Sequence, residues 1–234
     1  MPVSFWLIFF QSNKKNNWSR SFLLTSFWLG VLSSLLAVFL EIYYFEKRVP
    51  LLTAGSQNGL EVVWGILSGT LPIAVIEEFS KSLVVVWAIF RKKILSLQNG
   101  LMMGVLAGLS FAVTENGIYF ARFLAAGNDL ISGGFWQVVF LRFLFSTSAH
   151  IIYSGILGYF LAEFLSKETA EEKISAFLKA TLIPIAIHTS FNSFLETAWG
   201  WLIFPIVLGG LLVIFFLYSK KGSATFFIRE GGRL

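Results

Sequence analysis

The stretch that decides the fold is GLMMGVLAGLSFAVTENGIYF, residues 100–120. Its only charged residue is Glu115, which lies among apolar and small side chains. An apolar run of about 20 residues is long enough to cross the hydrocarbon core of a bilayer as an α-helix. Inserting a carboxylate at that depth costs roughly 2.5–3.5 kcal/mol, so such residues are usually functional. The stretch therefore predicts a transmembrane helix that carries a chemically active group.

The composition of the whole chain agrees with a place in the membrane. Of its 234 residues, 56% are hydrophobic and 13% are charged, and the mean hydropathy is +0.75. A soluble domain carries about 25% charged residues, so this chain does not have enough charge to cover its surface in water. It has no cysteine, which excludes disulfides, iron–sulfur clusters and thiolate metal sites.

Five further apolar stretches accompany the first. Together they predict an all-α fold, a polytopic membrane helix bundle of about six transmembrane helices, at residues 22–45, 60–90, 99–124, 135–164, 178–198 and 201–218. We expect Pro72 to kink the second helix, and we expect substrate access near that kink.

Thr169 and Glu172 fit a capping box, which predicts a short cytosolic helix before the fifth span. The expected organisation is an interfacial segment at 1–21, a transmembrane domain at 22–218 and a cytoplasmic tail at 219–234.

The basic residues predict how the bundle is oriented. They gather before the first span, after the second, between the fourth and fifth, and after the sixth, as Arg20, Arg91, Lys167 and Lys220 illustrate. By the positive-inside rule, this distribution places both termini in the cytoplasm (N-in and C-in). We therefore expect a multi-pass protein of the cell membrane, in contact with the lipid bilayer. The net charge of +5 reflects topology, and we expect no nucleic-acid partner.

Five ionisable residues are predicted to lie at one depth. Glu77 and Glu78, Glu115, His150 and His188 each fall near the middle of a predicted span, and together they come from four helices. The two histidines are the only ones in the chain. Because intramembrane charges are costly, this coincidence indicates a polar centre built for function. Glu41, in contrast, falls near the end of the first span, and we expect it in the headgroup zone.

Other polar residues are spaced to support these five. Lys81 follows Glu77 by four residues and Glu78 by three, so one helical face can hold both carboxylates against one ammonium group. Asn192 lies one turn beyond His188 and faces the same way. Arg142, in the fourth span, is either a structural partner of a carboxylate or a substrate contact. Small residues such as Gly104 and Gly108 in the third span, with Gly155 and Gly158 in the fourth, would let the two helices approach closely.

This set of residues suits two kinds of chemistry. Two adjacent buried carboxylates cannot both ionise cheaply, so one tends to hold a proton while the other acts as a base. A carboxylate base, a histidine and an amide that can donate to an oxyanion suffice for water attack on a peptide carbonyl. Alternatively, a divalent metal such as zinc can bind His150 and His188 together with Glu115 or Glu78. The sequence leaves open both this choice and which of Glu77 and Glu78 is the base.

At these residues the chain resembles the PrsW-type intramembrane proteases, relatives of the CAAX prenyl proteases. The resemblance spans roughly residues 60–195 and rests on four motifs in the family's order. One departure concerns the CAAX enzymes, which place a histidine where this chain has Glu115. The matching motifs are EExxK at Glu77-Glu78-Phe-Ser-Lys81, FxxxE followed by Asn at Phe111 to Asn116, the motif around His150, and HxxxN at His188 to Asn192.

The resemblance implies an endopeptidase that cuts membrane-anchored protein substrates within or near the bilayer. In bacteria the family is associated with the clipping of anti-sigma factors. The implied roles are water activation by Glu77 with Glu78, and control of their charge state by Lys81. The resemblance also implies that Glu115 and His150 belong to the water-binding centre, and that His188 and Asn192 stabilise the oxyanion.

Two other classes of protein place polar residues at the same depth. A proton- or ion-coupled transporter also needs carboxylates and histidines at mid-membrane. Transporters more often show paired broken helices in related halves, whereas here only the second span has a clear break. A non-catalytic membrane scaffold could keep the polar centre for packing alone. Replacing Glu77 or Glu78 by Gln separates the three classes. The change would abolish cleavage by a protease, flux through a transporter, or the stability of a scaffold.

Overall fold

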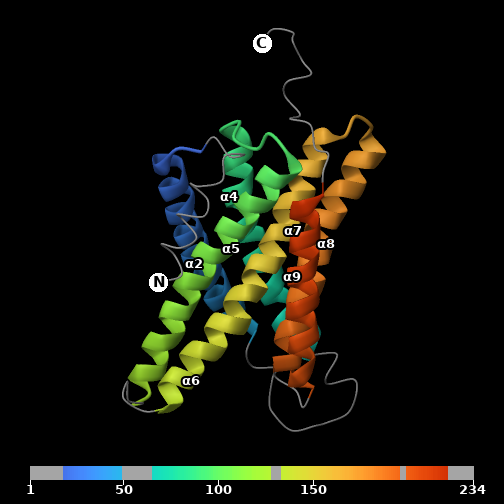
Figure 1. Ribbon diagram of the computed structural model, residues 1–234. Helices are drawn as coiled ribbons and strands as arrows, with labels where there is room; N and C mark the ends of the chain where they lie inside the picture. Colours follow the sequence, from blue (N-terminus) through green and yellow to red (C-terminus); the bar gives the residue numbers. More distant parts are fainter. Residues whose placement is uncertain (1–17, 49–64, 128–132, 196–198, 221–234) are drawn as a thin grey trace.

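The computed structural model describes residues 18–48, 65–127, 133–195 and 199–220, which form a bundle of long helices (Figure 1). The expected start of the second span, the residues 196–198, and most of the two terminal segments lie outside the described residues. No strand occurs in the described ranges. The elements are α2 (Arg20–Arg48), η2 (Ile66–Thr70), α4 (Leu71–Phe90), α5 (Leu97–Ala125), α6 (Gly133–Leu141), η3 (Arg142–Ser146), α7 (Thr147–Ser166), α8 (Ala170–Leu195), η4 (Gly200–Leu202) and α9 (Ile203–Ser219).

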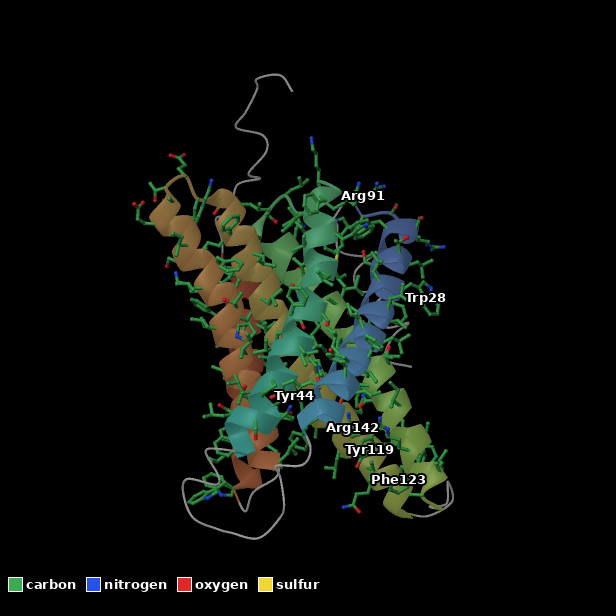
Figure 2. All side chains as sticks on the ribbon, turned by 180° about the vertical axis from the view of Figure 1, so that it is seen from behind. Trp28, Tyr44, Arg91, Tyr119, Phe123 and Arg142 are labelled. Atoms are coloured by element: carbon green, nitrogen blue, oxygen red, sulfur yellow. The ribbon has the colours of Figure 1, made fainter. Side chains whose placement is uncertain are left out.

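The prediction of an all-α membrane bundle is confirmed. Five helical segments are long and apolar enough to cross a membrane: 20–45, 97–125, 134–166, 170–195 and 200–219. α4 is the sixth long helix, and it differs from the others by carrying Glu77, Glu78 and Lys81 within its 20 residues. Large apolar side chains face outward, as Trp28 does in Figure 2, where a bilayer would cover them.

Among the described residues, Arg20, Arg91 and Lys220, which contributed to the predicted topology, lie at one end of the bundle. The indole Nε1 of Trp18, just before α2, donates to the carbonyl of Lys93 at 3.1 Å. The amide Nε2 of Gln98, at the start of α5, donates to the carbonyl of Lys220 at 2.9 Å. The start of α2, the α4–α5 turn and the end of α9 therefore share one end, as Figure 1 shows.

The expectation of a separate cytosolic helix before the fifth span is wrong. Thr169 does cap a helix, since its Oγ1 accepts a hydrogen bond from the Glu172 backbone N–H at 3.3 Å. That helix is α8 itself, which continues to Leu195. Because no glycine or proline stands between Glu172 and the apolar run, nothing ends the helix there.

Two long spans contain a π-helical turn. In the second span, η2 ends just before Pro72, so the predicted break is present. A proline at this position cannot donate to the carbonyl four residues earlier, and the Ser68 carbonyl instead accepts a hydrogen bond from the Tyr44 hydroxyl at 3.4 Å. The second π turn, η3, divides the fourth span at Arg142. Such turns are rare and frequently lie at functional sites.

α5 is the central helix, and it crosses α7 at very short range. Every α5 residue from Asn99 to Ala112 is buried. A Cβ on Gly104 would lie 1.8 Å from the Ser154 carbonyl oxygen, and one on Gly108 would lie 2.3 Å from that of His150. The predicted close approach of small faces is therefore confirmed. It fixes the position of α7, and hence of His150, against α5.

We expect Gly104→Ala to destabilise the protein by about 1–3 kcal/mol, because the added methyl group forces the two backbones apart. Gly117→Ala on the same helix is the matched control, since a Cβ there meets nothing within 4 Å. Thermal unfolding of both variants in detergent measures the difference. Equal melting temperatures would contradict the close helix crossing.

Candidate functional site

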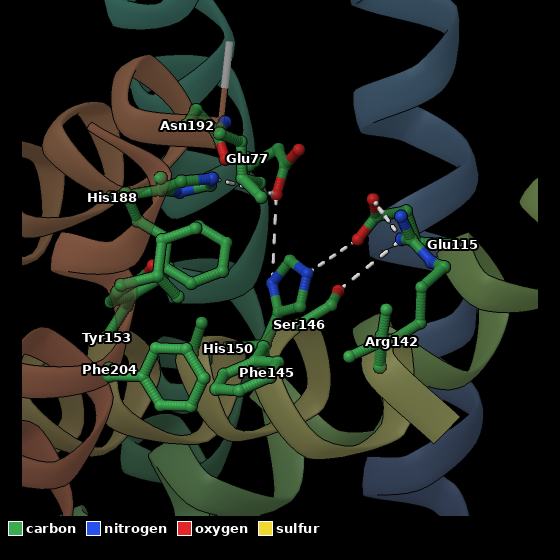
Figure 3. Close-up of a pocket in the computed structure, with 16 residues that line it drawn as sticks. Glu77, Glu115, Arg142, Phe145, Ser146, His150, Tyr153, His188, Asn192 and Phe204 are labelled. Atoms are coloured by element: carbon green, nitrogen blue, oxygen red, sulfur yellow. Dashed lines mark hydrogen bonds and ion pairs between the residues drawn. The ribbon is translucent and has the colours of Figure 1, made fainter. Parts of the chain in front are cut away.

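Four helices bring ionisable side chains to one place. α4 supplies Glu77, Glu78 and Lys81, and α5, α7 and α8 supply one each, Glu115, His150 and His188. Figure 3 shows four of these side chains, Glu77, Glu115, His150 and His188. Apart from Glu115, all of these side chains are less than a tenth exposed. The residues that the sequence singled out at one depth thus lie together in the structure.

Lys81 compensates the two adjacent carboxylates. Its Nζ donates to Glu77 Oε2 at 3.0 Å and to Glu78 Oε1 at 2.8 Å, and the side chain is completely buried. The ammonium group also stands 4.2 Å from the centre of the Phe111 ring. Because a buried charge is tolerated only when it is paired and hydrogen-bonded, these contacts explain how three charged groups fit within five residues of α4.

Each histidine is held from behind by a carboxylate. His188 Nδ1 lies 2.9 Å from Glu78 Oε1, and His150 Nε2 lies 2.5 Å from Glu115 Oε2. A hydrogen bond to one imidazole nitrogen fixes the orientation of the ring and decides what the other nitrogen can do. Glu78 and Glu115 therefore position the two rings.

The two remaining imidazole nitrogens face the same oxygen of Glu77. His188 Nε2 is 3.8 Å from Glu77 Oε2, and His150 Nδ1 is 3.9 Å from it (Figure 3). These separations are too long for direct hydrogen bonds. His150 Nδ1 is buried and has no hydrogen-bond partner among the described residues. The three atoms surround a point where a small polar ligand such as a water molecule would satisfy them.

Arg142 fixes Glu115 from the other side. The guanidinium donates from Nη2 to Glu115 Oε1 at 2.8 Å and from Nε to Asn116 Oδ1 at 2.7 Å. Asn116 in turn donates from its amide to the hydroxyl of Thr147 at 3.2 Å. Of the two roles expected for Arg142, the structure shows that of a structural carboxylate partner. The π turn that starts at Arg142 lies directly beside this contact.

Sequence reasoning missed Tyr153. Its ring stacks on that of His188, with centroids 4.7 Å apart and an interplanar angle of 18°. Its hydroxyl is buried and has no hydrogen-bond partner within the described ranges. The available signal was spacing, because Tyr153 follows His150 by three residues and so faces the same way. Asn192, which the sequence did single out, lines the same cavity.

A cavity of about 330 Å³ opens in front of the histidines. Its polar wall carries Glu77, His150 and His188, and its apolar wall is made by side chains from η3, α8 and α9 such as Phe145, Phe191 and Phe204. Pro72, near which access was expected, does not line this cavity. The kink is packed against α8 instead, where the hydroxyl groups of Thr70 and Ser193 lie 2.9 Å apart.

The donor atoms suit zinc in type but not in arrangement. Glu78 and Glu115, the carboxylates expected as ligands, lie behind the histidines, so the carboxylate in front is Glu77. Ligands of a tetrahedral zinc ion lie roughly 3.4 Å from one another, and the two histidine nitrogens lie 3.8 and 3.9 Å from Glu77 Oε2. Glu77 Oε2 already accepts from the Lys81 ammonium. Within the described part of the chain, no three such side chains form a ready metal-ligand set.

Comparisons with known proteins place the chain in a family. Three curated relatives are each named "Protease PrsW". The one from Clostridioides difficile (strain 630) is 25% identical over 134 residues, which cover 57% of this chain and 53% of the relative. The one from Oceanobacillus iheyensis is 27% identical over 148 residues, with coverages of 63% and 61%. The one from Shouchella clausii is 26% identical over 129 residues, with coverages of 53% and 53%.

The chain thus spans between about half and three-fifths of the length of these relatives. No solved structure matches it. A family model described as "PrsW family intramembrane metalloprotease" matches residues 19–219, which is most of the chain. That match includes all four helices that build the polar centre, so the chain belongs to the PrsW family of intramembrane metalloproteases.

Proposed function

We propose that this protein is an intramembrane endopeptidase that hydrolyses peptide bonds of membrane-anchored proteins, with Glu77 as the general base. The observation that carries the proposal is the convergence of the free nitrogens of His150 and His188 on one oxygen of Glu77, beside an apolar cavity. Membership of the PrsW family and the names of the relatives support proteolysis.

Glu77 suits the role of base better than Glu78. Glu77 lines the cavity, whereas Glu78 does not. Glu78 Oε1 is shared between the Lys81 ammonium and His188 Nδ1, and the side chain is 2% exposed. A base must lie within hydrogen-bond reach of the proton that it removes. Glu78 therefore positions His188, and Glu77 takes the proton from water.

The proposed reaction starts with a water molecule between Glu77 Oε2, His150 Nδ1 and His188 Nε2. As the water oxygen attacks the scissile carbonyl carbon, its proton passes to Glu77. The amide of Asn192, one turn beyond His188, donates a hydrogen bond to the resulting oxyanion. Glu77 then delivers the proton to the leaving nitrogen as the C–N bond breaks, and the products are a new carboxylic acid and a new amine.

The cavity indicates which part of a substrate reaches the site. Its apolar wall, with Phe145, Phe191 and Phe204, suits an apolar segment next to the scissile bond. A helix hides its peptide bonds, so the segment must be extended locally where it meets Glu77. Membrane-anchored regulators of the anti-sigma-factor kind, with which the family is associated, are the first substrate class to test.

Replacing Glu77 by Gln should lower kcat by about 10²- to 10⁴-fold, the usual contribution of a general base. The amide keeps the shape of the side chain but cannot accept the proton. Cleavage of a fluorescent membrane-anchored peptide in proteoliposomes measures the effect. Glu163→Gln is the control, because Glu163 pairs with Lys167 far from the cavity. Equal activity of Glu77→Gln and wild type would contradict the assignment.

Removal of divalent metals should leave kcat unchanged, because the Lys81 ammonium occupies the oxygen that a cation would need. The measurement compares cleavage before and after dialysis of the purified protein against EDTA. A zinc protease in the same detergent serves as the positive control for chelation. Loss of cleavage that added zinc restores would instead place a metal ion among Glu77, His150 and His188, where it would supply Lewis acidity to the bound water.

A further inference from the structure

A second cavity reaches the site from the opposite side. It has a volume of about 360 Å³ and lies between α2, α4 and α5. Glu77 and Glu115 line this cavity as well as the first one. Apart from these two glutamates, the residues that line the first cavity do not line the second. The two glutamates therefore stand between two compartments.

The second cavity is a slot between two matching helix faces. On α2 its lining residues start at Ser34 and recur 4, 7, 8 and 11 positions later. On α5 they start at Phe111 and recur at the same four spacings. This spacing defines one face of each helix, and 11 residues of helix span about 16 Å. The slot thus runs along α2 and α5 from the depth of Glu77 toward the ends of both helices.

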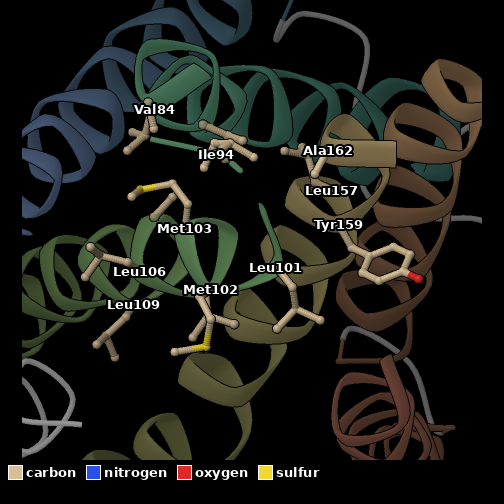
Figure 4. Packing of buried hydrophobic residues seen from close by; sticks show 14 of the residues in the cluster. Val84, Ile94, Leu101, Met102, Met103, Leu106, Leu109, Leu157, Tyr159 and Ala162 are labelled. Carbon is tan, nitrogen blue, oxygen red and sulfur yellow. The ribbon is translucent and has the colours of Figure 1, made fainter. Parts of the chain in front are cut away.

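The slot is closed at its inner end. One turn before Ser34, a Cβ on Gly30 would lie 1.7 Å from Ser110 Oγ, so α2 and α5 touch there. Beyond this contact, apolar side chains of the first half of α5, such as Met103 and Leu106, pack in one cluster with Val84 of α4 (Figure 4). The slot therefore leads to the end of the bundle near Tyr44 and Tyr119, away from Arg91 (Figure 2).

Polar groups line the slot in the middle of an apolar bundle. Glu41 lines it from α2. Arg122 lines it from α5. Ser34 is fully buried, and its hydroxyl has no hydrogen-bond partner among the described residues. In a membrane such groups face a water-filled cavity or pair with one another, and a polar cavity of this size holds ordered water.

We propose that the slot between α2 and α5 is a water channel, kept hydrated by Glu41 and Arg122, that supplies the water consumed at Glu77. The supply role rests on the proposed function, whereas hydration of the slot does not. The arrangement separates the reactants, because the apolar cavity admits the substrate segment while water arrives at Glu77 from the other side. The substrate can then fill its cavity without cutting off the nucleophile.

Hydration can be tested with single cysteines, since the natural chain has none. Val38→Cys places a thiol in the slot. Phe39→Cys, one position along, places it where a 65% exposed side chain points away from the bundle into lipid. The probe is the cationic thiol reagent 2-(trimethylammonium)ethyl methanethiosulfonate, added to both faces of open membrane fragments. The thiolate is the reactive form, and it forms only in contact with water.

We expect Val38→Cys to react at least roughly tenfold faster than Phe39→Cys, because only the first thiol meets water and ionises. An Ala126→Cys variant, in the exposed turn after α5, shows that the reagent is active. Equal, slow reaction at positions 38 and 39 would overturn the proposal and indicate a slot filled by lipid. This outcome does not depend on whether the protein is a protease.

The supply role is tested on the same Val38→Cys protein, so folding of a new variant is not in question. Modification should lower kcat for the membrane-anchored peptide and leave KM unchanged, because the substrate cavity is separate. Treated Phe39→Cys should keep its kcat. A modified Val38→Cys protein with unchanged kcat would show a hydrated slot that does not feed the reaction, and would overturn the supply role.

Discussion

A single buried ammonium group lets the polar centre exist inside the membrane. Lys81 bridges Glu77 and Glu78, so the two carboxylates share one compensating charge. Glu78 can then hold His188 by a hydrogen bond. In the same way, Arg142 pairs with Glu115, which holds His150. Isolated charges are expensive in a bilayer, so this pairing lets the charged groups lie inside the bundle. Glu77 and Glu115 both line the two cavities, but the two oxygens of Glu115 are bonded to Arg142 and His150.

Much of this network could be predicted from the sequence, because helical spacing fixes which side chains share a face. The spacing of Lys81 from Glu77 and Glu78 predicted their contacts, and the structure confirms them. The glycines of the third and fourth spans predicted the close crossing of α5 and α7, which is also confirmed. Counting along each span placed Glu115 and His150 at the same depth, and they form a hydrogen bond.

Other features could not be predicted, because they depend on how the helices are placed around one another. Depth along α2 does not show that the side chain of Glu41 lines a cavity between α2 and α5. The π turn that starts at Arg142 contains no glycine or proline from which it could have been predicted. The helix break before Pro72 was predicted correctly, and beside it Thr70 contacts Ser193 of α8. Pro72 does not line the cavity in front of the histidines.

Proteolysis that depends on Glu77 is tested most directly by mapping new protein N-termini in membranes. The comparison is between cells that carry the wild type and cells that carry Glu77→Gln at equal expression. We expect at least one membrane protein to lose a cleaved N-terminus in the variant, at a position in or near its membrane segment. Identical sets of N-termini, with the variant folded and inserted, would contradict proteolysis and favour a role such as ion-coupled transport.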